Sequence, residues 1–293
     1  MSRKHNEASR KFHDRVAKKY DAIYDDPYWE FHDRVTWNHL KNYLPKDTTA
    51  SVMDLGCGTG KWGLKLLKAG YPTTFTDLSV NMLDEVSKKL AVWSEKPDLA
   101  SKAARGTVQA ADAVDLRAFP EGHFQLVMAM GDVVSICSNP GQAINEVARL
   151  LAPGGMFVFT VDNRLAAFDY FVESGNLEEL GSFVKTGQTH WLTRSEHEQF
   201  AVHMFMPDEI ESLLRGRGYT VLSRIGKTIL PVRNNKKFFD PPEAIERLVA
   251  LEHLLNKDPV AHARASHLQL AAQKTGAGVW DQERNIRVPG PVS

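Results

Sequence analysis

The sequence predicts an α/β protein built on a doubly wound, mostly parallel sheet. From residue 50 onward, short apolar runs alternate with segments in which apolar residues recur at helical spacing. This alternation is typical of parallel strands joined by helices. Two of the runs, 124–130 and 156–161, are apolar almost throughout, as expected of strands that helices cover on both faces. The first run leads into a glycine-rich turn, where a ligand would be able to approach the backbone closely.

The glycine-rich turn lies in residues 51–60, which read Ser-Val-Met-Asp-Leu-Gly-Cys-Gly-Thr-Gly. An apolar run containing Asp54 is followed by glycines at alternate positions, Gly56, Gly58 and Gly60. Leucines at helical spacing come next, so the segment is predicted to be a strand, a tight turn and a helix. Such a turn either holds a nucleotide-like ligand or only joins a strand to a helix. The rest of the sequence decides between these alternatives.

The other elements follow from the same apolar patterns, with turn residues between them. The predicted strands cover residues 51–55, 73–76, 107–110, 124–130, 156–161, 219–230 and 265–273. The predicted helices cover residues 12–23, 29–44, 61–69, 80–90, 140–151, 207–214 and 245–255.

The alternation of predicted strands and helices begins and ends at particular residues, and these positions define the predicted domains. Residues 1–44 are predicted to form helices rich in aromatic residues, which either pack on the main domain or act as a lid over a ligand. Residues 45–274 form the main domain. It contains an insertion, 163–206, with two short amphipathic segments and a strand-like region. Residues 275–293 carry Gly and Pro without periodicity and are expected to be a loose C-terminal tail.

Composition narrows the range of functions. The chain has 293 residues with 43% hydrophobic and 25% charged residues, which is ordinary for a globular protein. Lys plus Arg equals Asp plus Glu, at 36 each, so a partner bound mainly through phosphates, such as nucleic acid, is not expected. Cys57 and Cys137 suggest no disulfide framework. Because no run has the composition of a membrane span or a signal peptide, we expect a cytoplasmic protein that does not insert into a membrane.

Acidic residues follow the predicted strands at their carboxyl ends. Asp77 ends the second strand, Asp112 follows the third, and Asp132 follows the fourth. Ligands of doubly wound proteins bind at this edge of the sheet. Asp77 also lies about 20 residues beyond the glycine turn, the separation at which an acid reaches ribose hydroxyls. Each acid alone could instead cap a helix or a turn, but their agreement favours a nucleotide-like ligand.

The spacing of the glycines bears on which ligand this is. A dinucleotide site prefers Gly-x-Gly-x-x-Gly, with a helix N-terminus at the pyrophosphate. Here the pattern is Gly-x-Gly-x-Gly with Asp54 just before it. An acid at that position suits a ligand that carries an amino group and a cationic centre better than it suits a pyrophosphate. The sequence therefore favours S-adenosylmethionine as cofactor.

Five motifs resemble those of the class I S-adenosylmethionine-dependent methyltransferases, and in particular the small-molecule enzymes of methyltransferase types 11 and 25. The motifs are the glycine turn at 52–60, Thr-Asp-Leu-Ser at 76–79, Ala-Asp-Ala at 111–113, the strand and following residues at 124–132, and Leu-Leu-Ala-Pro-Gly-Gly at 150–155. The resemblance implies a seven-stranded Rossmann-like sheet whose last strand is antiparallel. It also implies an N-terminal helical lid and a cap insertion after the fifth strand.

The resemblance also implies a set of cofactor-binding residues. Glycines of the turn would face the methionine part of the cofactor, an acid would hold the ribose, another acid would accept from the adenine amino group, and a lid tyrosine would reach the cofactor's carboxylate. The implied set is Tyr20, Asp54, Gly56, Gly58, Gly60, Asp77, Leu78, Met82, Asp112, Ala113 and Gly131.

The catalytic candidates are Asp132, which follows the fourth strand, and His190 and His203 in the insertion. An acid or a histidine there would orient or deprotonate the acceptor. The alternative is that they cap a turn or pack at the surface. The histidine spacing does not predict a metal site.

The expected reaction is methyl transfer to an O, N or C nucleophile of a small molecule, by a monomer or homodimer. Two other classes stay open: a nucleotide-dependent oxidoreductase, and a binding module that holds S-adenosylmethionine without catalysis. Calorimetry with NAD and with S-adenosylmethionine would separate the first of these from a methyltransferase.

Overall fold

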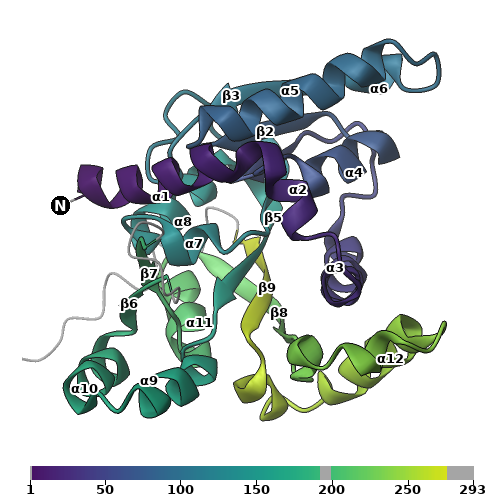
Figure 1. Cartoon of the computed structure of the whole chain (residues 1–293). Coiled ribbons are helices and arrows are strands. Elements are labelled where there is room, and N and C mark those ends of the chain that lie inside the picture. Colours follow the sequence, from purple (N-terminus) through teal and green to yellow (C-terminus); the bar gives the residue numbers. More distant parts are fainter. Residues whose placement is uncertain (1, 192–198, 276–293) are drawn as a thin grey trace, which may run out of the picture.

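A seven-stranded sheet runs through the centre of the computed structural model, which describes residues 2–191 and 199–275 (Figure 1). The strand order is β3-β2-β1-β4-β5-β9-β8. Strands β1 to β5 are parallel, and β9 is antiparallel to both of its neighbours. The strands are β1 (Val52–Leu55), β2 (Thr73–Asp77), β3 (Gly106–Ala110), β4 (Phe124–Ala129), β5 (Leu151–Asp162), β8 (Tyr219–Lys227) and β9 (His267–Lys274). The predicted fold class and the antiparallel last strand are confirmed.

Strand β5 begins earlier than its apolar run predicts. The run starts at Met156, but Leu151 already pairs with Phe124 of β4. Gly154 has φ +73°, a conformation that side chains with a Cβ rarely adopt, and the register between β4 and β5 shifts in this stretch. The Pro-Gly-Gly sequence that predicts a turn is therefore accommodated as an irregular start of the strand.

Two helices of the main domain begin at residues whose side chains accept a hydrogen bond from a free backbone N–H. The Ser79 hydroxyl accepts a hydrogen bond from the Met82 N–H at 3.2 Å, and Asn139 accepts one from the Gln142 N–H at 3.0 Å. The helices are α4 (Lys61–Ala69), α5 (Val80–Ser94), α6 (Ala100–Ala103), α7 (Val133–Ile136), α8 (Pro140–Leu150), α11 (Pro207–Arg215) and α12 (Ala244–Leu255). Short 3-10 turns lie at Ala17–Lys19, Lys41–Tyr43, Arg164–Ala167, Val232–Asn234, Lys236–Phe239 and Ala261–Arg264.

The N-terminal segment is helical, but it is divided differently from the prediction. The sequence predicts one helix over residues 12–23, whereas the chain forms α1 (Ser2–Val16) and α2 (Tyr20–Ile23) with a 3-10 turn between them. Helix α3 (Pro27–Leu40) begins where the Asp26 side chain accepts a hydrogen bond from the Trp29 N–H at 3.0 Å. Figure 1 shows α1 lying beside α5 and above the insertion. The assignment of a lid domain to residues 1–44 stays a prediction.

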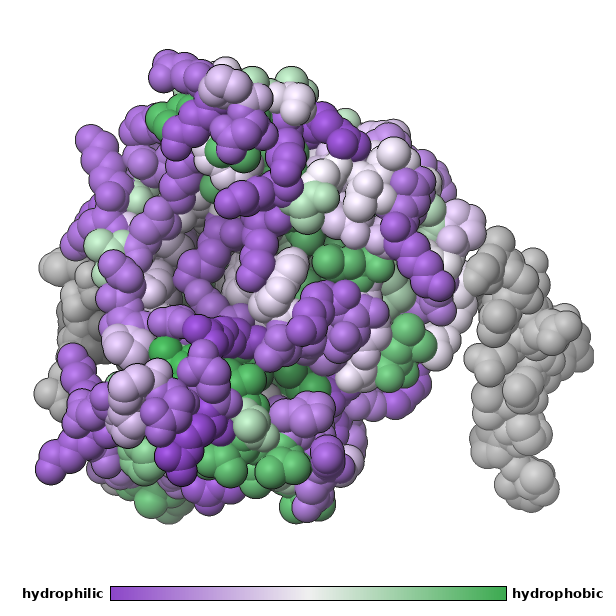
Figure 2. All heavy atoms as spheres, turned by 90° about the vertical axis from the view of Figure 1, so that its right-hand side faces the viewer, coloured by the Kyte–Doolittle hydropathy of each residue, from purple (hydrophilic) through white to green (hydrophobic). Residues whose placement is uncertain are grey.

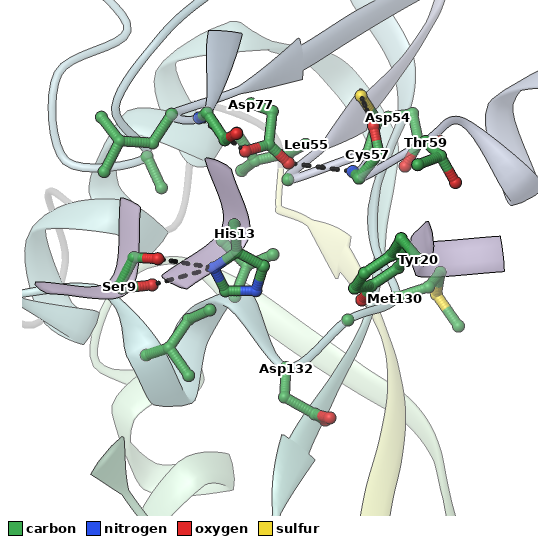
Figure 3. A pocket seen from close by; sticks show the side chains of 18 of the residues that line it. Ser9, His13, Tyr20, Asp54, Leu55, Cys57, Thr59, Asp77, Met130 and Asp132 are labelled. Atoms are coloured by element: carbon green, nitrogen blue, oxygen red, sulfur yellow. Dashed lines mark hydrogen bonds between the residues drawn. The ribbon is translucent and has the colours of Figure 1, made fainter. Parts of the chain in front are cut away.

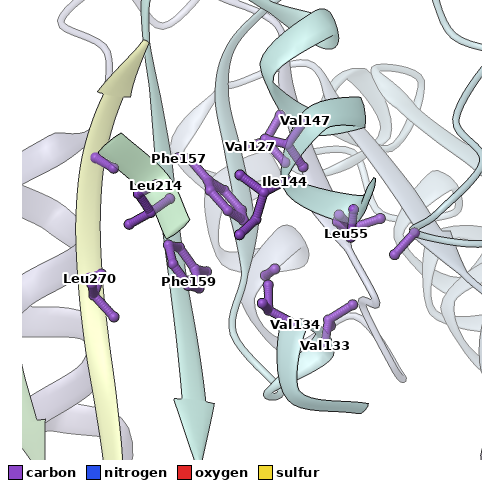
Figure 4. Close-up of a cluster of buried hydrophobic side chains, with 14 of the residues drawn as sticks. Leu55, Val127, Val133, Val134, Ile144, Val147, Phe157, Phe159, Leu214 and Leu270 are labelled. Carbon is purple, nitrogen blue, oxygen red and sulfur yellow. The ribbon is translucent and has the colours of Figure 1, made fainter. Parts of the chain in front are cut away.

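Apolar side chains alternate between the two faces of the sheet. In β4, Val127 packs with α8 and α11 on one face, while Leu126 and Met128 pack with α3 and α4 on the other. On the first face, the rings of Phe157 and Phe159 stack with centroids 4.2 Å apart, close to Leu214 and Ile144 (Figure 4). Burial on both faces explains why these runs are continuously apolar in the sequence.

The insertion forms a small unit of its own. It contains α9 (Phe168–Ser174), α10 (Leu177–Thr186) and a hairpin of β6 (Gln188–His190) with β7 (Ala201–His203). These elements bury a cluster of phenylalanines, including Phe171 and Phe183. The two predicted amphipathic segments thus correspond to helices, and part of the strand-like region corresponds to the hairpin. Residues 192–198 lie outside the described residues, as does the predicted tail from 276 onward.

The face shown in Figure 2 is mostly hydrophilic. Apolar side chains gather in its lower part, where α12 lies, and the exposed ones in that region include Phe238, Leu251, Leu254 and Val260. Within residues 2–191 and 199–275, no helix is long and apolar enough to cross a membrane.

Candidate active site

A cavity of about 250 Å³ lies at the carboxyl ends of β1 and β4. These strands are neighbours in the sheet although β2 and β3 come between them in the chain. The strand order therefore reverses there, which is where doubly wound proteins bind ligands. Helices α1, α2 and α3 contribute the opposite wall. Figure 3 shows His13 and Tyr20 from these helices in the same cavity as Asp54 and Asp77.

Most of the residues selected from the sequence lie together in this cavity. Its lining includes Tyr20, Asp54, Gly56, Gly58, Asp77, Leu78, Asp112, Ala113, Gly131 and Asp132. Gly60 and Met82 lie just outside it. Met82 is buried between α5 and the N-terminal segment, in contact with Val16 and Ala17.

The glycine turn depends on backbone conformations that other residues rarely adopt. Gly56 and Gly58 have φ of +64° and +53°. A Cβ on Gly56 would lie 2.2 Å from the Val133 Cγ2 atom, so a larger residue there would displace the start of α7. The turn therefore packs tightly against the loop after β4.

Asp77 is held in place by the backbone on either side of it. Its Oδ2 accepts a hydrogen bond from the Gly58 N–H at 2.9 Å, and its Oδ1 accepts one from the Ser79 N–H at 2.8 Å. Burial raises the pKa of Asp77, against the opposing effect of these N–H groups and of His13. Since each carboxylate oxygen has a second lone pair, Asp77 can still accept hydrogen bonds from a ligand.

Asp54 is almost fully buried beneath the glycine turn, with 1% of its surface exposed. Its Oδ2 accepts a hydrogen bond from the Gly63 N–H at 2.7 Å. Burial raises its pKa to about 7. A cationic group of a ligand beside Asp54 would favour the ionised form.

Asp112 is contacted by the N-terminal helix. Its Oδ2 accepts a hydrogen bond from the Asn6 Nδ2 atom at 2.5 Å, and its Oδ1 accepts one from the Val114 N–H at 3.2 Å. The sequence pattern does not reveal Asn6, because a single polar residue on a helix gives no sign of the distant residue that it contacts. The contact places α1 directly over the third of the strand-end acids.

A second contact fastens the N-terminal segment to the glycine turn. Asp21 forms an ion pair with Lys89 of α5 at 2.7 Å and accepts a hydrogen bond from the Thr59 hydroxyl at 2.5 Å. Lys89 also donates to the Thr59 carbonyl at 2.8 Å. Beside this contact, the ring of Tyr20 lies 3.5 Å from where a Cβ on Gly58 would be. Burial raises the pKa of Tyr20 well above its usual value, so its hydroxyl stays protonated at neutral pH.

At the other end of the cavity, Asp132, Asp162 and His267 form what we call the acid–histidine cluster. Asp132 follows β4 with φ +56°, and its N–H donates to the Thr160 hydroxyl at 3.1 Å. Asp162 ends β5, and the antiparallel register pairs it with His267 at the start of β9. The sequence interpretation missed both partners. Asp162 follows an apolar run just as Asp77 does, so that signal was present, but His267 has no local signal.

Burial shifts the pKa values of the ionisable groups in and around the acid–histidine cluster. It raises the pKa of Asp162 well above its usual value, with a further contribution from the charge of Asp132. It lowers the pKa of His267. The nearby Lys227 is 1% exposed, and burial lowers its pKa to about 8 although Asp132, Asp33 and Asp162 act in the opposite direction. Burial lowers the pKa of His32, which also lines the cavity, to about 3.

The two histidines of the insertion that were catalytic candidates do not line the cavity. The Nε2 atom of His203 lies 2.7 Å from the Glu209 Oε1 atom, and its Nδ1 atom contacts Gln188. His190 lies exposed on β6. The insertion instead contributes Trp191 and Phe200 to the lining, and α1 contributes His13. His197, a further histidine of this region, lies outside the described residues.

Comparison with known proteins agrees with this geometry. Residues 52–155 match the family model described as a methyltransferase domain. The chain is 32% identical over 148 residues to a demethylmenaquinone methyltransferase of Leptospira interrogans, covering 49% of this chain and 56% of that protein. Residues 52–155 are therefore similar in sequence to methyltransferase domains.

Two further similarities extend beyond the matched domain. A ubiquinone biosynthesis O-methyltransferase of a Caulobacter species is 27% identical over 181 residues, covering 62% of this chain and 64% of that protein. A solved S-adenosylmethionine-dependent methyltransferase of Methanosarcina mazei shares the fold with a TM-score of 0.57 at 19% identity, covering 81% of this chain and 97% of that one. The match spans a little over half of the first relative's length, so it characterises the methyltransferase domain rather than the whole protein.

The residues that line the cavity fit S-adenosylmethionine, the cofactor that the sequence predicts. S-adenosylmethionine carries an ammonium group, a ribose diol and an adenine amino group, all of which donate hydrogen bonds. Among the carboxylates that line the cavity, those of Asp54, Asp77 and Asp112 are each already oriented by a backbone N–H. Their separate positions at the ends of β1, β2 and β3 suit a ligand that extends along the edge of the sheet.

Proposed function

We propose that this protein is a methyltransferase that transfers a methyl group from S-adenosylmethionine to a small-molecule acceptor. The observation that carries the proposal is the convergence of the glycine turn and three oriented carboxylates in one cavity at the switch point of the sheet. The matches to methyltransferases support the same reaction. Because a shared fold alone does not establish an activity, the reaction needs a direct test.

Each carboxylate has a proposed part in binding the cofactor. Asp77 would accept hydrogen bonds from the ribose diol, and Asp112 from the adenine amino group. Asp54 would face the ammonium group, whose charge offsets the cost of ionising a buried acid. Leu78 and Ala113 would contact adenine, and Gly131 would leave room for the sulfonium region, since no atom lies within 4 Å of where its Cβ would be.

The cofactor supplies an activated methyl group, and the protein must position the acceptor and exclude water. Helices α1, α2 and α3 close the cavity on the side opposite the sheet. Asp132 and His267 line the cavity beyond Gly131. Either side chain would take up the proton that a hydroxyl or ammonium acceptor releases. This assignment replaces the insertion histidines, which lie outside the cavity.

The acceptor we propose is a planar or apolar small molecule. Aromatic side chains from three parts of the chain line the cavity, namely Phe12, Tyr24, Trp29, Trp191 and Phe200. Two relatives are named demethylmenaquinone methyltransferase and ubiquinone biosynthesis O-methyltransferase. Flat apolar acceptors would pack on these rings with little loss of side-chain freedom.

Calorimetry with S-adenosylmethionine, S-adenosylhomocysteine and NAD tests the cofactor. We expect both adenosyl ligands to bind and NAD not to bind. A metabolite screen for S-adenosylhomocysteine release then tests catalysis and identifies the acceptor. Binding of NAD alone would favour an oxidoreductase, and cofactor binding without turnover of any acceptor would favour a binding module.

The contact of Asp21 with Lys89 and Thr59 predicts that the N-terminal segment contributes to the affinity for the cofactor. Asp21→Ala removes the ion pair with Lys89 and the hydrogen bond from Thr59, so closure over the glycine turn is weakened. Because Asp21 is largely exposed, the effect is expected to be modest, about three- to ten-fold in the cofactor dissociation constant. Calorimetry measures it, with Asp25→Ala as the matched control, since Asp25 is exposed on the same segment and does not line the cavity. Equal affinity in Asp21→Ala and Asp25→Ala would show that this contact does not hold the segment closed.

A further inference from the structure

The acid–histidine cluster has the arrangement of a metal site. His267 Nε2 lies 3.6 Å from Asp132 Oδ2 and 3.7 Å from Asp162 Oδ1. One potential ligand atom from each side chain lies within 4.8 Å of the others. The two measured distances are too long for hydrogen bonds. Ligand atoms around one ion with bonds of about 2.1 Å are separated by about 3.0–3.4 Å, so the two carboxylates and the imidazole would have to move closer together to hold a common ion.

Unpartnered atoms in the cluster point to a missing ligand. Asp162 is 7% exposed, and its Oδ2 atom is buried without a hydrogen-bond partner. The same holds for Asp132 Oδ1 and His267 Nδ1. Buried polar atoms without partners are rare in native proteins, and a bound ion or water is a usual partner for them. Here three such atoms occur in three adjacent side chains.

The charged side chains near the acid–histidine cluster are compatible with a bound metal cation. Asp33, another acid whose charge acts on Lys227, forms an ion pair with Lys61 at 2.7 Å, so its charge is already balanced. Lys227 is the buried cation whose charge acts on both Asp132 and Asp162. A bound divalent cation would compensate both carboxylates of the cluster in their ionised form.

We propose that the acid–histidine cluster binds a divalent first-row transition-metal ion at the end of the cavity. One imidazole and two carboxylates suit Zn²⁺, Fe²⁺, Co²⁺ or Mn²⁺ better than Mg²⁺ or Ca²⁺, which prefer oxygen ligands alone. Three protein ligands would leave a coordination position open, as in catalytic zinc sites. Asp132 and His267 line the cavity, so the open position would be accessible from it.

The site would select acceptors with a metal-binding oxygen. If the proposed methyl transfer is correct, on which this step rests, an acceptor hydroxyl bound to the ion would release its proton to solvent near neutral pH, because a bound cation lowers the pKa of its ligands. Asp132 and His267 would then hold the ion instead of taking up that proton. The ion would also fix the acceptor oxygen beyond Gly131. The site favours oxygen acceptors over carbon ones.

Titration of the metal-free full chain with Co²⁺ tests the site directly. The parent is expected to take up one Co²⁺ per chain, with visible absorption bands that Zn²⁺ abolishes by competition. Asp162→Asn keeps the shape of the side chain but loses a ligand charge, so it should weaken Co²⁺ binding by about 100-fold or more. The matched control is His39→Gln: His39 is likewise buried with an unpartnered Nδ1 atom, but it bonds to Ser223 rather than to the cluster.

The absence of saturable Co²⁺ binding by the folded parent would overturn the proposal, as would equal binding by Asp162→Asn and His39→Gln. Circular dichroism verifies folding, and Asp132→Asn, at a more exposed ligand, replaces Asp162→Asn if that variant does not fold. Calorimetry with S-adenosylmethionine on the same samples separates the two proposals. Cofactor binding without Co²⁺ uptake would refute only the metal site, and Co²⁺ uptake without cofactor binding would refute only the methyltransferase.

Discussion

Asp77→Ala is expected to weaken binding of S-adenosylmethionine by at least about 100-fold. The substitution removes two proposed hydrogen bonds from the ribose diol to a charged acceptor, each worth about 1.5–3 kcal/mol. It also removes the acceptors for the Gly58 and Ser79 N–H groups, so part of the loss would come from a less ordered glycine turn. Isothermal titration calorimetry with S-adenosylmethionine and S-adenosylhomocysteine measures the change.

Two further variants separate these contributions. Asp77→Asn keeps an oxygen that can accept one backbone N–H but removes the charge, so it should bind more tightly than Asp77→Ala and still more weakly than the parent. Asp115→Ala is the matched control, because Asp115 lies exposed near the same edge of the sheet, paired with Arg117 and outside the cavity. Unchanged affinity in Asp77→Ala would remove Asp77 from the cofactor site.

The cofactor side of the cavity could be predicted because its signals are local in the sequence. Asp54, the glycines and Asp77 lie within one strand–turn–helix–strand segment. Their spacing sets their positions once the strands are parallel. Asp112 follows from the same rule, since the carboxyl ends of parallel strands meet at one edge.

At the other end of the cavity, Asp132 follows from the same rule, but its approach to Asp162 and His267 could not be predicted, because these residues meet only through long-range pairing. His267 approaches Asp162 through the antiparallel register of β5 and β9, which no local pattern specifies. On the cofactor side, the contact of Asn6 with Asp112 could not be predicted either, because it depends on the docking of α1. Conversely, His203 has the residue type of a general base, but the start of α11 places Glu209 beside it, and the pair lies outside the cavity.

Gly63→Ala is expected to lower the free energy of unfolding by about 2–3 kcal/mol. Gly63 lies in α4, where alanine normally favours the helix by up to about 1 kcal/mol. Here its Cβ would lie 2.3 Å from Phe75 Cε1 and 2.7 Å from Asp54 Oδ2. Phe75 is fully buried in β2, so the helix must move away from the sheet. Chemical denaturation of the ligand-free protein measures the difference.

The contrast with Gly181→Ala makes this prediction specific. Gly181 lies inside α10, and no atom lies within 4 Å of where its Cβ would be. Alanine there should therefore raise stability, by up to about 1 kcal/mol. Moving α4 would also draw the Gly63 N–H away from Asp54, so cofactor affinity should fall in Gly63→Ala and stay unchanged in Gly181→Ala. If both variants were stabilised equally, α4 would not pack on β2 as closely as the structure shows, and the buried position of Asp54 beneath the glycine turn would need revision.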